Sequence, residues 1–538
     1  MKFSPVLLTI GLVLCLFSCA DTEQETASET PSRPNILFIM SDDHAYQAIS
    51  AYMDHLIQTP NIDRIAKEGM LFSNACVTNS ICAPSRAVIL TGKHSHLNGK
   101  IDNRSPFDTT QVTFPQIFQD AGYQTAMYGK LHFGNNPKGV DDFMILPGQG
   151  NYINPRFITA EGDTTIEGYV TDIITDLTID WLDKKRDPNK PFFMAYLHKA
   201  PHRPWWPRPD KFKEFTKKTF PEPASLFDDY SNRGTAAKTA EMNLLYHMQY
   251  PHDSKIRPET LEAMGEVKPE VPGFAGGFNG PYGRTNDAQR AQYDPVLDSI
   301  NQFFQENWPG MTDEEKMKWK YQRYMQDYLG CISSVDDNVG RVLDYLEESG
   351  LAENTIVVYT SDQGFYLGEH GWFDKRFIYD ESFKTPLMVK WPGVIEAGST
   401  NNEMVQNLDF APTFLEAAGI DVPTDMQGES LMPLLKGEND SWDRDAVYYH
   451  YYEYPAVHMV KRHYGVVTKE YKLAHFYYDV DEWELYDRMK DPQEMNNVYD
   501  DPEYADVVAE LKDKLAELRV KYKDSAELDQ KFIDQYNK

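Results

Sequence analysis

Residues 34–44 read Pro-Asn-Ile-Leu-Phe-Ile-Met-Ser-Asp-Asp-His, an apolar run that ends in two acidic residues. The run shows no alternation of polar and apolar side chains, which is typical of a strand buried on both faces of a parallel sheet. Asp42 and Asp43 follow it directly. Because α/β sheets hold their sites at the carboxyl ends of the strands, this stretch predicts both the fold class and the place of the site.

Further patterns of this kind follow along the chain. We expect strands at residues 125–128, 191–197, 355–360 and 387–391, and helices at residues 113–121, 170–183 and 408–418. Strands that alternate with helices predict an α/β fold, with a sheet sandwiched by helices. Asp362 and Gln363 come just after the strand at 355–360, so they would lie at the same edge as Asp42 and Asp43.

Composition divides the chain into regions. Residues 207–312 are polar, rich in Pro and Gly and weakly periodic, so we interpret them as a long insertion over the site, within a catalytic domain at residues 34–440. Residues 441–538 would form a smaller C-terminal α+β subdomain. Its short aromatic strands, at 464–467 and 471–478, favour an antiparallel sheet, and an amphipathic helix at 502–521 ends the fold.

The N-terminus is typical of an exported protein. Residues 6–17 are apolar, follow a lysine and are too few to span a membrane, as in a secretion signal. Residues 16–19, Leu-Phe-Ser-Cys, resemble a bacterial lipobox. We therefore expect a lipoprotein signal peptide at residues 1–19, lipidation of Cys19, a tether at residues 20–33 and an exported protein that is lipid-anchored to a bacterial membrane, in the periplasm or at the cell surface. Ordinary signal cleavage is the alternative.

The chain is strongly acidic. It has 538 residues, with 53 Lys and Arg against 83 Asp and Glu, and a net charge of −30. Such acidity argues against nucleic acid as a partner. An anionic substrate would need local positive charge, and basic residues do gather around one short motif: Arg86, Lys93, Lys100, Arg104 and Lys130.

That motif is residues 82–92, Cys-Ala-Pro-Ser-Arg-Ala-Val-Ile-Leu-Thr-Gly. Pro84 and Ser85 favour the start of a helix, where backbone N–H groups can receive an anion. Arg86, one helical turn after Cys82, can clamp a tetrahedral oxyanion. A shorter pattern of this kind would equally suit a structural thiol at a helix start.

The full motif closely resembles the signature of the type I, formylglycine-dependent sulfatases of the alkaline-phosphatase-like superfamily. The resemblance implies a mixed sheet sandwiched by helices. It also implies that Cys82 is oxidised to formylglycine, an aldehyde whose hydrate is the nucleophile. The partner that makes this group would be a formylglycine-generating enzyme or an anaerobic sulfatase-maturating enzyme.

A metal site is predicted from the two acidic pairs. Asp42, Asp43, Asp362 and Gln363 offer only oxygen ligands, and such hard ligands suit calcium or magnesium. Either pair alone would also suit a solvated turn or a helix cap. The resemblance implies one calcium ion on these four residues, with the formylglycine at Cys82 completing its coordination.

Three further segments match the family. Residues 122–132 match its second signature, which implies that Lys130 and His132 contact the sulfate and the formylglycine. On an extended segment both side chains would face one pocket, and His132 could remove a proton. The resemblance implies that His202 binds sulfate and acts as a general acid, and that Lys375 bridges the sulfate and the leaving oxygen.

Several residues beside these segments are candidates for substrate binding. We predict substrate contacts for His198, Arg376 and His458. The alternatives are a supporting position for His198, a structural salt bridge for Arg376 and a domain-interface position for His458. Trp205 and Trp206 would either stack on a sugar ring or pack in a pocket wall.

The sequence thus predicts a sulfatase that hydrolyses sulfate esters on a carbohydrate. Residues 198–204 and 454–459 resemble bacterial N-acetylglucosamine-6-sulfatases, the mucin-desulfating sulfatases, which favours 6-O-sulfated N-acetylglucosamine in a glycosaminoglycan or mucin. Three alternatives stay open: a sulfatase for an algal polysaccharide such as ulvan, carrageenan or porphyran, a phosphatase or phosphonate hydrolase of the same fold, and a non-catalytic glycan-binding lipoprotein.

Overall fold

The computed structural model describes residues 1, 2, 4, 33–265 and 276–536. The expected lipidation at Cys19 lies outside the described residues, as do nearly all of the signal peptide and of the tether, so these stay predictions. Within the described ranges, no helix is both long enough and apolar enough to cross a membrane.

A ten-stranded sheet forms the centre of the fold. β1 (Asn35–Ser41) lies in its middle, parallel to β8 (Phe192–Leu197) on one side and to β9 (Thr355–Ser361) on the other. All seven residues of β1 are buried, as its apolar sequence predicts. β12 (Leu387–Lys390) pairs antiparallel with β9, so the sheet is mixed and the expected fold class is confirmed.

The sheet continues on both sides of these strands. β4 (Gln124–Gly129) pairs parallel with β8 and so brings Lys130 to the edge at which β1 and β9 end. The other strands of the sheet are β2 (Met70–Phe72), β5 (Asp142–Ile145), β6 (Arg156–Thr159), β7 (Gly162–Thr165) and β13 (Ser399–Asn401). Two small sheets pair β3 (Ala75–Cys76) with β14 (Val405–Gln406) and β10 (Tyr366–Leu367) with β11 (Phe373–Asp374).

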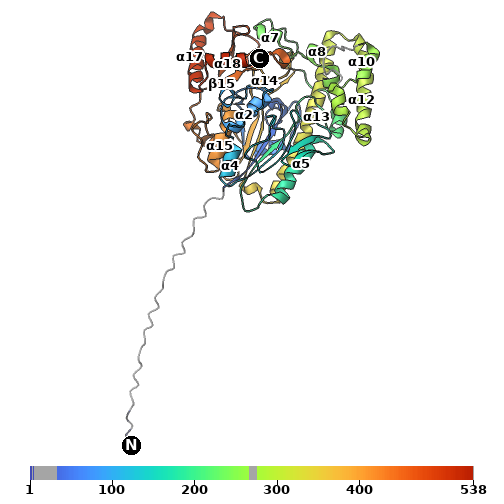
Figure 1. Cartoon of the computed structure of the whole chain (residues 1–538). Helices are drawn as coiled ribbons and strands as arrows, with labels where there is room; N and C mark the ends of the chain where they lie inside the picture. The colour runs from blue at the N-terminus through green and yellow to red at the C-terminus, as the bar shows by residue number, and fades with distance from the viewer. Residues whose placement is uncertain (3, 5–32, 266–275, 537–538) are drawn as a thin grey trace. The chain divides into compact units, whose positions relative to one another are not determined.

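Helices cover both faces of this sheet (Figure 1). Leu37 and Ile39 of β1 belong to the core on one face, and Ile36, Phe38 and Met40 to the core on the other. The first face is closed by α1 (Ile62–Lys67), α5 (Val170–Asp180) and α13 (Asp313–Glu348), and the second by α2 (Cys82–Thr91), α4 (Phe114–Asp120) and α15 (Phe410–Ala417). Because side chains alternate between two covered faces, all residues of β1 from Ile36 to Met40 are apolar.

The longest helix, α13, was not among the predicted elements and has 36 residues. It begins after a capping box, in which the side chains of Thr312 and Glu315 hydrogen-bond each other's backbone N–H. Its Tyr328 hydroxyl donates to the carbonyl of Asp43 at 2.7 Å and accepts from the N–H of Ala45 at 2.8 Å. α13 therefore fixes the loop that follows β1.

The region between residues 207 and 312 is more helical than its weak periodicity predicts. Its helices are α6 (Pro209–Phe215), α7 (Thr235–Thr239), α8 (Leu244–His247), α9 (Tyr250–Asp253), α10 (Pro258–Met264), α11 (Gly276–Tyr282) and α12 (Asp287–Asn307). α6 and α8 pack against α13. That this region is an insertion over the site stays a prediction.

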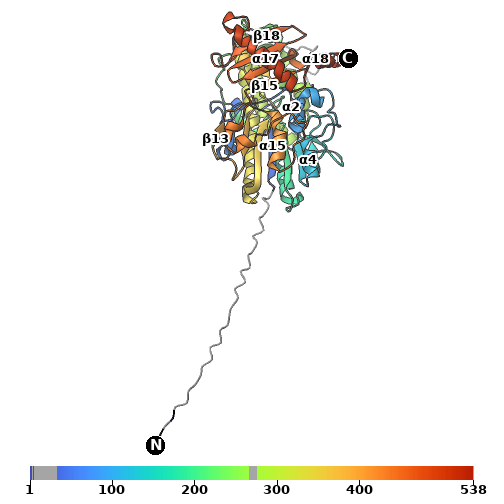
Figure 2. The same cartoon turned by 90° about the vertical axis from the view of Figure 1, so that its left-hand side faces the viewer.

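The C-terminal part holds the expected antiparallel sheet (Figure 2). Its strands are β15 (Ala446–Tyr451), β16 (His463–Thr468), β17 (Tyr471–Phe476) and β18 (Glu482–Asp487), and α17 (Ala505–Lys521) packs on them. The expectation that this helix ends the fold was wrong, because α18 (Ala526–Tyr536) follows it. The remaining short α-helices are α3 (Ser95–Asn98), α14 (Asp380–Phe383) and α16 (Met432–Leu435).

Gly129 should tolerate no side chain. Its φ is +110°, and a Cβ there would lie 1.8 Å from the carbonyl oxygen of Leu197 on β8. We expect Gly129→Ala to lower the free energy of unfolding by about 2 kcal/mol or more, since both the backbone and the strand pairing must shift. Gly310→Ala is the control, because a Cβ at Gly310 meets no atom within 4 Å. Denaturant melts measure the free energy of unfolding. Equal values for the two variants would contradict the close contact between Gly129 and β8.

Candidate active site

Cys82 is the first residue of α2 and is fully buried. Its Sγ lies 3.4 Å from Nζ of Lys375 and 4.0 Å from Oδ1 of Asp43. Burial raises the pKa of the Cys82 thiol to about 12, against the opposing effect of Lys130 and Lys375. The unmodified thiol is therefore neutral near pH 7 and a poor nucleophile.

Arg86 holds α2 against the strand ends. Its Nε and Nη2 both lie 2.9 Å from Oδ2 of Asp362, and its Nη1 donates to the carbonyl of Lys130. The hydroxyl of Ser85 donates to the carbonyl of Asp362. These contacts place the N-terminal turn of α2, with its free backbone N–H groups, beside the acidic residues that follow β1 and β9.

Three buried carboxylates and three buried cations meet at this point. They are Asp42, Asp43 and Asp362 with Arg86, Lys130 and Lys375, and each side chain is at most 2% exposed. Asp42 pairs with Lys130, and its other oxygen lies 3.4 Å from Nη2 of Arg86. Asp43 accepts from Nζ of Lys375 at 2.5 Å. The charges balance within the cluster, which makes their burial tolerable.

Some oxygens of this cluster are free to hold a cation. Oδ1 of Asp42, Oδ2 of Asp43 and Oε1 of Gln363 are buried, and none has a hydrogen-bond donor among the described residues. Burial raises the pKa of Asp43 to about 7, with Lys375 opposing it and the neighbouring carboxylates adding to it. Atoms of Asp42, Asp43, Cys82 and His202 lie within 4.8 Å of one another. The three free oxygens, from two carboxylates and one amide, therefore fit a hard divalent cation.

Two of the predicted histidines lie at this cluster as neutral bases. Burial lowers the pKa of His132 well below its usual value, with Lys130 adding to the effect, and its Nδ1 is buried without a hydrogen-bond partner in the described part of the chain. The segment is not extended as predicted, since His132 has a φ of +67°. Nδ1 of His202 must donate to the carbonyl of Arg203, at 2.5 Å, so its Nε2, 3.7 Å from Oδ2 of Asp43, is the free site for a proton.

The three predicted substrate residues are all buried, and each has different contacts. His198 is fully buried, with its ring 4.3 Å from that of Tyr196, which fits the supporting position. Arg376 is held in salt bridges to Asp374 at 3.1 Å and to Glu453 at 2.9 Å. His458 donates from Nδ1 to the carbonyl of Glu241 at 2.7 Å, and its Nε2 lies 3.3 Å from Asp374.

Trp205 and Trp206 pack inside the protein. Both are 0% exposed. The ring of Trp205 lies 4.6 Å from that of Tyr324 on α13, and Trp206 packs on Tyr293 of α12 at 5.6 Å. Both rings belong to the core, so stacking on a sugar is wrong, because no face of either ring is open.

Sequence patterns missed some residues that shape the site. Asp374 contacts both Arg376 and His458 and directly precedes Lys375, and Tyr328 hydrogen-bonds the loop that carries Asp43. Asp374 directly precedes Lys375, which the family resemblance had singled out, so its position in the sequence was a usable signal. Tyr328 gave no such signal, because its role depends on a contact across the whole fold.

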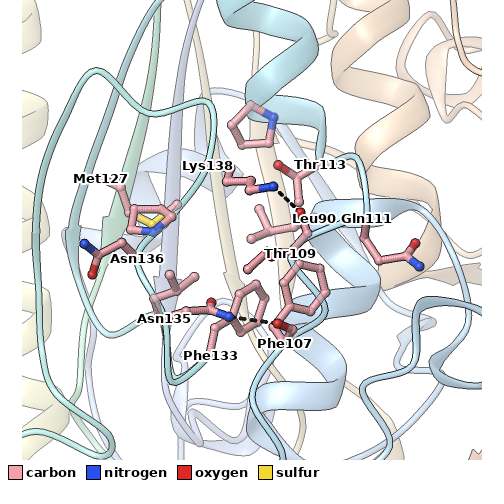
Figure 3. Close-up of a pocket in the computed structure, with 13 residues that line it drawn as sticks. Leu90, Phe107, Thr109, Gln111, Thr113, Met127, Phe133, Asn135, Asn136 and Lys138 are labelled. Carbon is pink, nitrogen blue, oxygen red and sulfur yellow. Dashed lines mark hydrogen bonds between the residues drawn. The ribbon is translucent and has the colours of Figure 1, made fainter.

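A small, partly open pocket lies apart from this cluster, around the far end of α2 (Figure 3). Its lining is largely apolar, and Lys138 and Asn135 hydrogen-bond the carbonyls of Thr109 and Phe107 at its side. None of the predicted site residues lines it.

Two family models match the chain. The model named Sulfatase matches residues 34–420, and the model of the C-terminal part of N-sulphoglucosamine sulphohydrolase matches residues 368–521. The first match includes all six residues of the buried charge cluster, Asp42, Asp43, Arg86, Lys130, Asp362 and Lys375.

Known proteins resemble the chain over nearly its full length. An N-acetylglucosamine-6-O-sulfatase of Bacteroides thetaiotaomicron is 48% identical over 534 residues, which cover 98% of this chain and 92% of that protein. An ulvan-active sulfatase of Formosa agariphila is 25% identical, over 96% of this chain and 88% of its own.

A solved structure agrees with these matches. A protein in complex with its substrate D-glucosamine-2-N,6-O-disulfate superposes with a TM-score of 0.86 and 47% identity, over 92% of this chain and 99% of that one. The chain belongs to the sulfatase family and is a sulfuric ester hydrolase.

Proposed function

We propose that this protein removes the 6-O-sulfate from glucosamine residues of a glycosaminoglycan or mucin, with 6-O-sulfated N-acetylglucosamine as the simplest substrate. The observation that carries the reaction is the buried cluster in which Cys82 faces Lys375, Asp43 and the N-terminus of α2. The substrate is supported by the relative of 48% identity, an N-acetylglucosamine-6-O-sulfatase, and by the similar structure with a 6-O-sulfated glucosamine.

Formylglycine made from Cys82 would supply a hydroxyl nucleophile, and a calcium ion held by Asp42, Asp43, Asp362 and Gln363 would supply a Lewis acid beside it. The chain's own groups do the rest. Arg86, Lys130 and Lys375 present a fixed set of positive charges where a tetrahedral anion must sit.

Proton transfer falls to three groups, Lys375, His202 and His132. Lys375 is cationic, because Asp43 and its other acidic neighbours raise its pKa against the effect of burial, and it can donate to the leaving sugar oxygen. His202 is neutral with its proton on Nδ1, so its Nε2 can share that role only after it has accepted a proton. His132, kept neutral by burial, can accept the proton whose loss completes the cycle.

Sulfate release depends on residue 82 in this proposal. We expect the matured protein to release sulfate from 6-O-sulfated N-acetylglucosamine and Cys82→Ala to release none, because no hydroxyl nucleophile can form. Cys331→Ala, which removes another buried thiol, is the matched control and keeps activity. Ion chromatography measures the sulfate. Sulfate release only from algal oligosaccharides would overturn the proposed substrate. Release of phosphate from aryl phosphates faster than sulfate from aryl sulfates would overturn the proposed reaction.

Metal binding has a readout that does not need activity. We expect calcium at a hundredfold excess over its Kd to stabilise the protein by about 2.7 kcal/mol, and Asp42→Asn to lose this effect because it removes a ligand charge. Asp440→Asn, at an exposed carboxylate, is the control. A thermal melt in calcium or EDTA measures the shift. If calcium raises the melting temperature of wild type and of Asp42→Asn equally, the ion binds at another place.

The burial of Cys82 limits when conversion can occur. At 0% exposure the thiol is closed to a maturation enzyme in the folded protein. We expect co-expression with such an enzyme to yield formylglycine, and addition of that enzyme to folded, unconverted protein to yield none. Mass spectrometry of the peptide that contains residue 82 separates the two cases, and equal conversion in both would show that the native site opens.

Export with a lipid anchor at Cys19 would place the enzyme where polymeric sugars are met. We expect labelled palmitate to enter the protein in a bacterial host and Cys19→Ser to abolish the labelling. Soluble, unlabelled wild-type protein in the medium would instead indicate ordinary signal cleavage.

A further inference from the structure

A group of cations and tyrosines lies beside the catalytic cluster. It is built from the loop after α3, the segment between β15 and β16, and the end of α18, and we call it the rim cluster: Arg104, Tyr454, Lys461, Arg462 and Tyr536. Arg104 lies over the ring of Tyr536 at 4.9 Å, and Arg462 lies over the same ring at 5.7 Å. Lys461 lies over the ring of Tyr454 at 4.1 Å. Stacking of this kind orients a cation without neutralising it.

One chain of contacts links the rim cluster to the nucleophile. The side-chain oxygen of Asn103 accepts from the N–H of Ala83, the residue after Cys82, at 3.0 Å. Arg104 is the next residue, is exposed and donates to the carbonyl of Pro455 at 3.3 Å. The hydroxyl of Tyr536 donates to the same carbonyl at 3.2 Å. α18 therefore reaches the loop that leads to His458.

A second chain of contacts returns from that loop to Cys82. Nε2 of His458 lies 3.3 Å from Asp374, whose neighbour Lys375 lies 3.4 Å from Sγ of Cys82. These contacts link Arg104, which is exposed, to two neighbours of Cys82, Ala83 and Lys375. Arg104 therefore lies at the surface beside segments that form the site, outside the buried cluster.

The rim cluster carries positive charge that its surroundings leave unpaired. Arg462 pairs with Asp479 at 2.8 Å, but in the described part of the chain no carboxylate lies within 4.0 Å of the charged groups of Arg104 or Lys461. Asp102 accepts from backbone N–H groups, and Glu453 is paired with Arg376. In a chain of net charge −30, two free cations at the margin of an anion site are a specific feature.

We propose that the rim cluster binds a second anionic group of the substrate, a sulfate or carboxylate other than the ester that is cleaved. Arginine suits both groups, because its planar fork matches their paired oxygens. The proposal rests on the proposed function and deepens it, since it restricts the substrate to sugars that carry a further negative charge on the same or the adjoining unit.

The test compares three substrates of the matured enzyme. The first is 6-O-sulfated N-acetylglucosamine, which has one anion. The second is D-glucosamine-2-N,6-O-disulfate, with a second sulfate on the same sugar, and the third is a disaccharide in which 6-O-sulfated N-acetylglucosamine is linked to a uronic acid. The variant is Arg104→Gln with Lys461→Gln, and the control is Lys436→Gln, at an exposed lysine after α16.

We expect the double variant to lose about tenfold in kcat/KM on the disulfate or the uronate substrate, mainly through KM, which is the size of one charge-assisted hydrogen bond. On the singly charged sugar, kcat/KM of the double variant should stay close to that of wild type. Added salt should reduce the difference in kcat/KM between wild type and variant on the doubly charged substrates. Tyr536→Leu removes the ring under Arg104 and should therefore also lower kcat/KM on the substrate that the double variant affects. Loss confined to the disulfate places the second anion on the same sugar, and loss confined to the uronate places it on the neighbour.

Two results would overturn the proposal. One is unchanged kinetics of the double variant on all three substrates. The other is an equal loss of kcat/KM on all three substrates, because the rim cluster would then act on the cleaved sulfate or on folding. A thermal melt distinguishes these two causes. If wild-type enzyme releases sulfate from none of them, the proposed function fails and the rim proposal with it. Release from all three without a selective loss contradicts the rim proposal alone.

Discussion

The structure depends on a balance of buried charge at the carboxyl ends of three parallel strands. Asp42 and Asp43 follow β1, Asp362 follows β9 and Lys130 follows β4, so the sheet itself brings them together. Arg86 and Lys375 come from outside the sheet and complete the balance. A charge left unpaired in this interior would cost several kcal/mol, so the correct sheet order and the correct site are selected together.

The C-terminal sheet takes part in this arrangement through β15. The hydroxyl of Tyr449 accepts from the N–H of Ser80 at 3.1 Å and donates to the carbonyl of Arg376 at 2.6 Å. It thereby braces the segment that precedes Cys82 and the segment that carries Lys375. α13 braces the third side, through Tyr328 and the loop after β1. The catalytic cluster is small, but elements from the whole chain fix its geometry.

Much of this could be read from the sequence because the informative features are local. The apolar runs of β1, β8 and β9 show burial directly, and the residues that follow them must lie at one edge of the sheet.

Features that depend on distant partners gave weaker signals. Tyr328 looks like any helical tyrosine, and the burial of Trp205 and Trp206 depends on α12 and α13. The helix α18 was not predicted, because the amphipathic pattern of α17 was interpreted as the last element of the fold. The positive φ of His132 is set by packing around it, so an extended segment was the natural but wrong expectation.

The topology of the sheet also sets an order of events in synthesis. Ile36 pairs with Phe193 on one side and with Ile356 on the other, so β1 cannot be enclosed until the ribosome has made more than half of the chain. Contacts between such distant segments form slowly. Until they form, the thiol of Cys82 belongs to an open, partly ordered chain. The same strand order that seals this residue in the finished protein thus leaves a period, early in the life of each molecule, when its chemistry can still be changed.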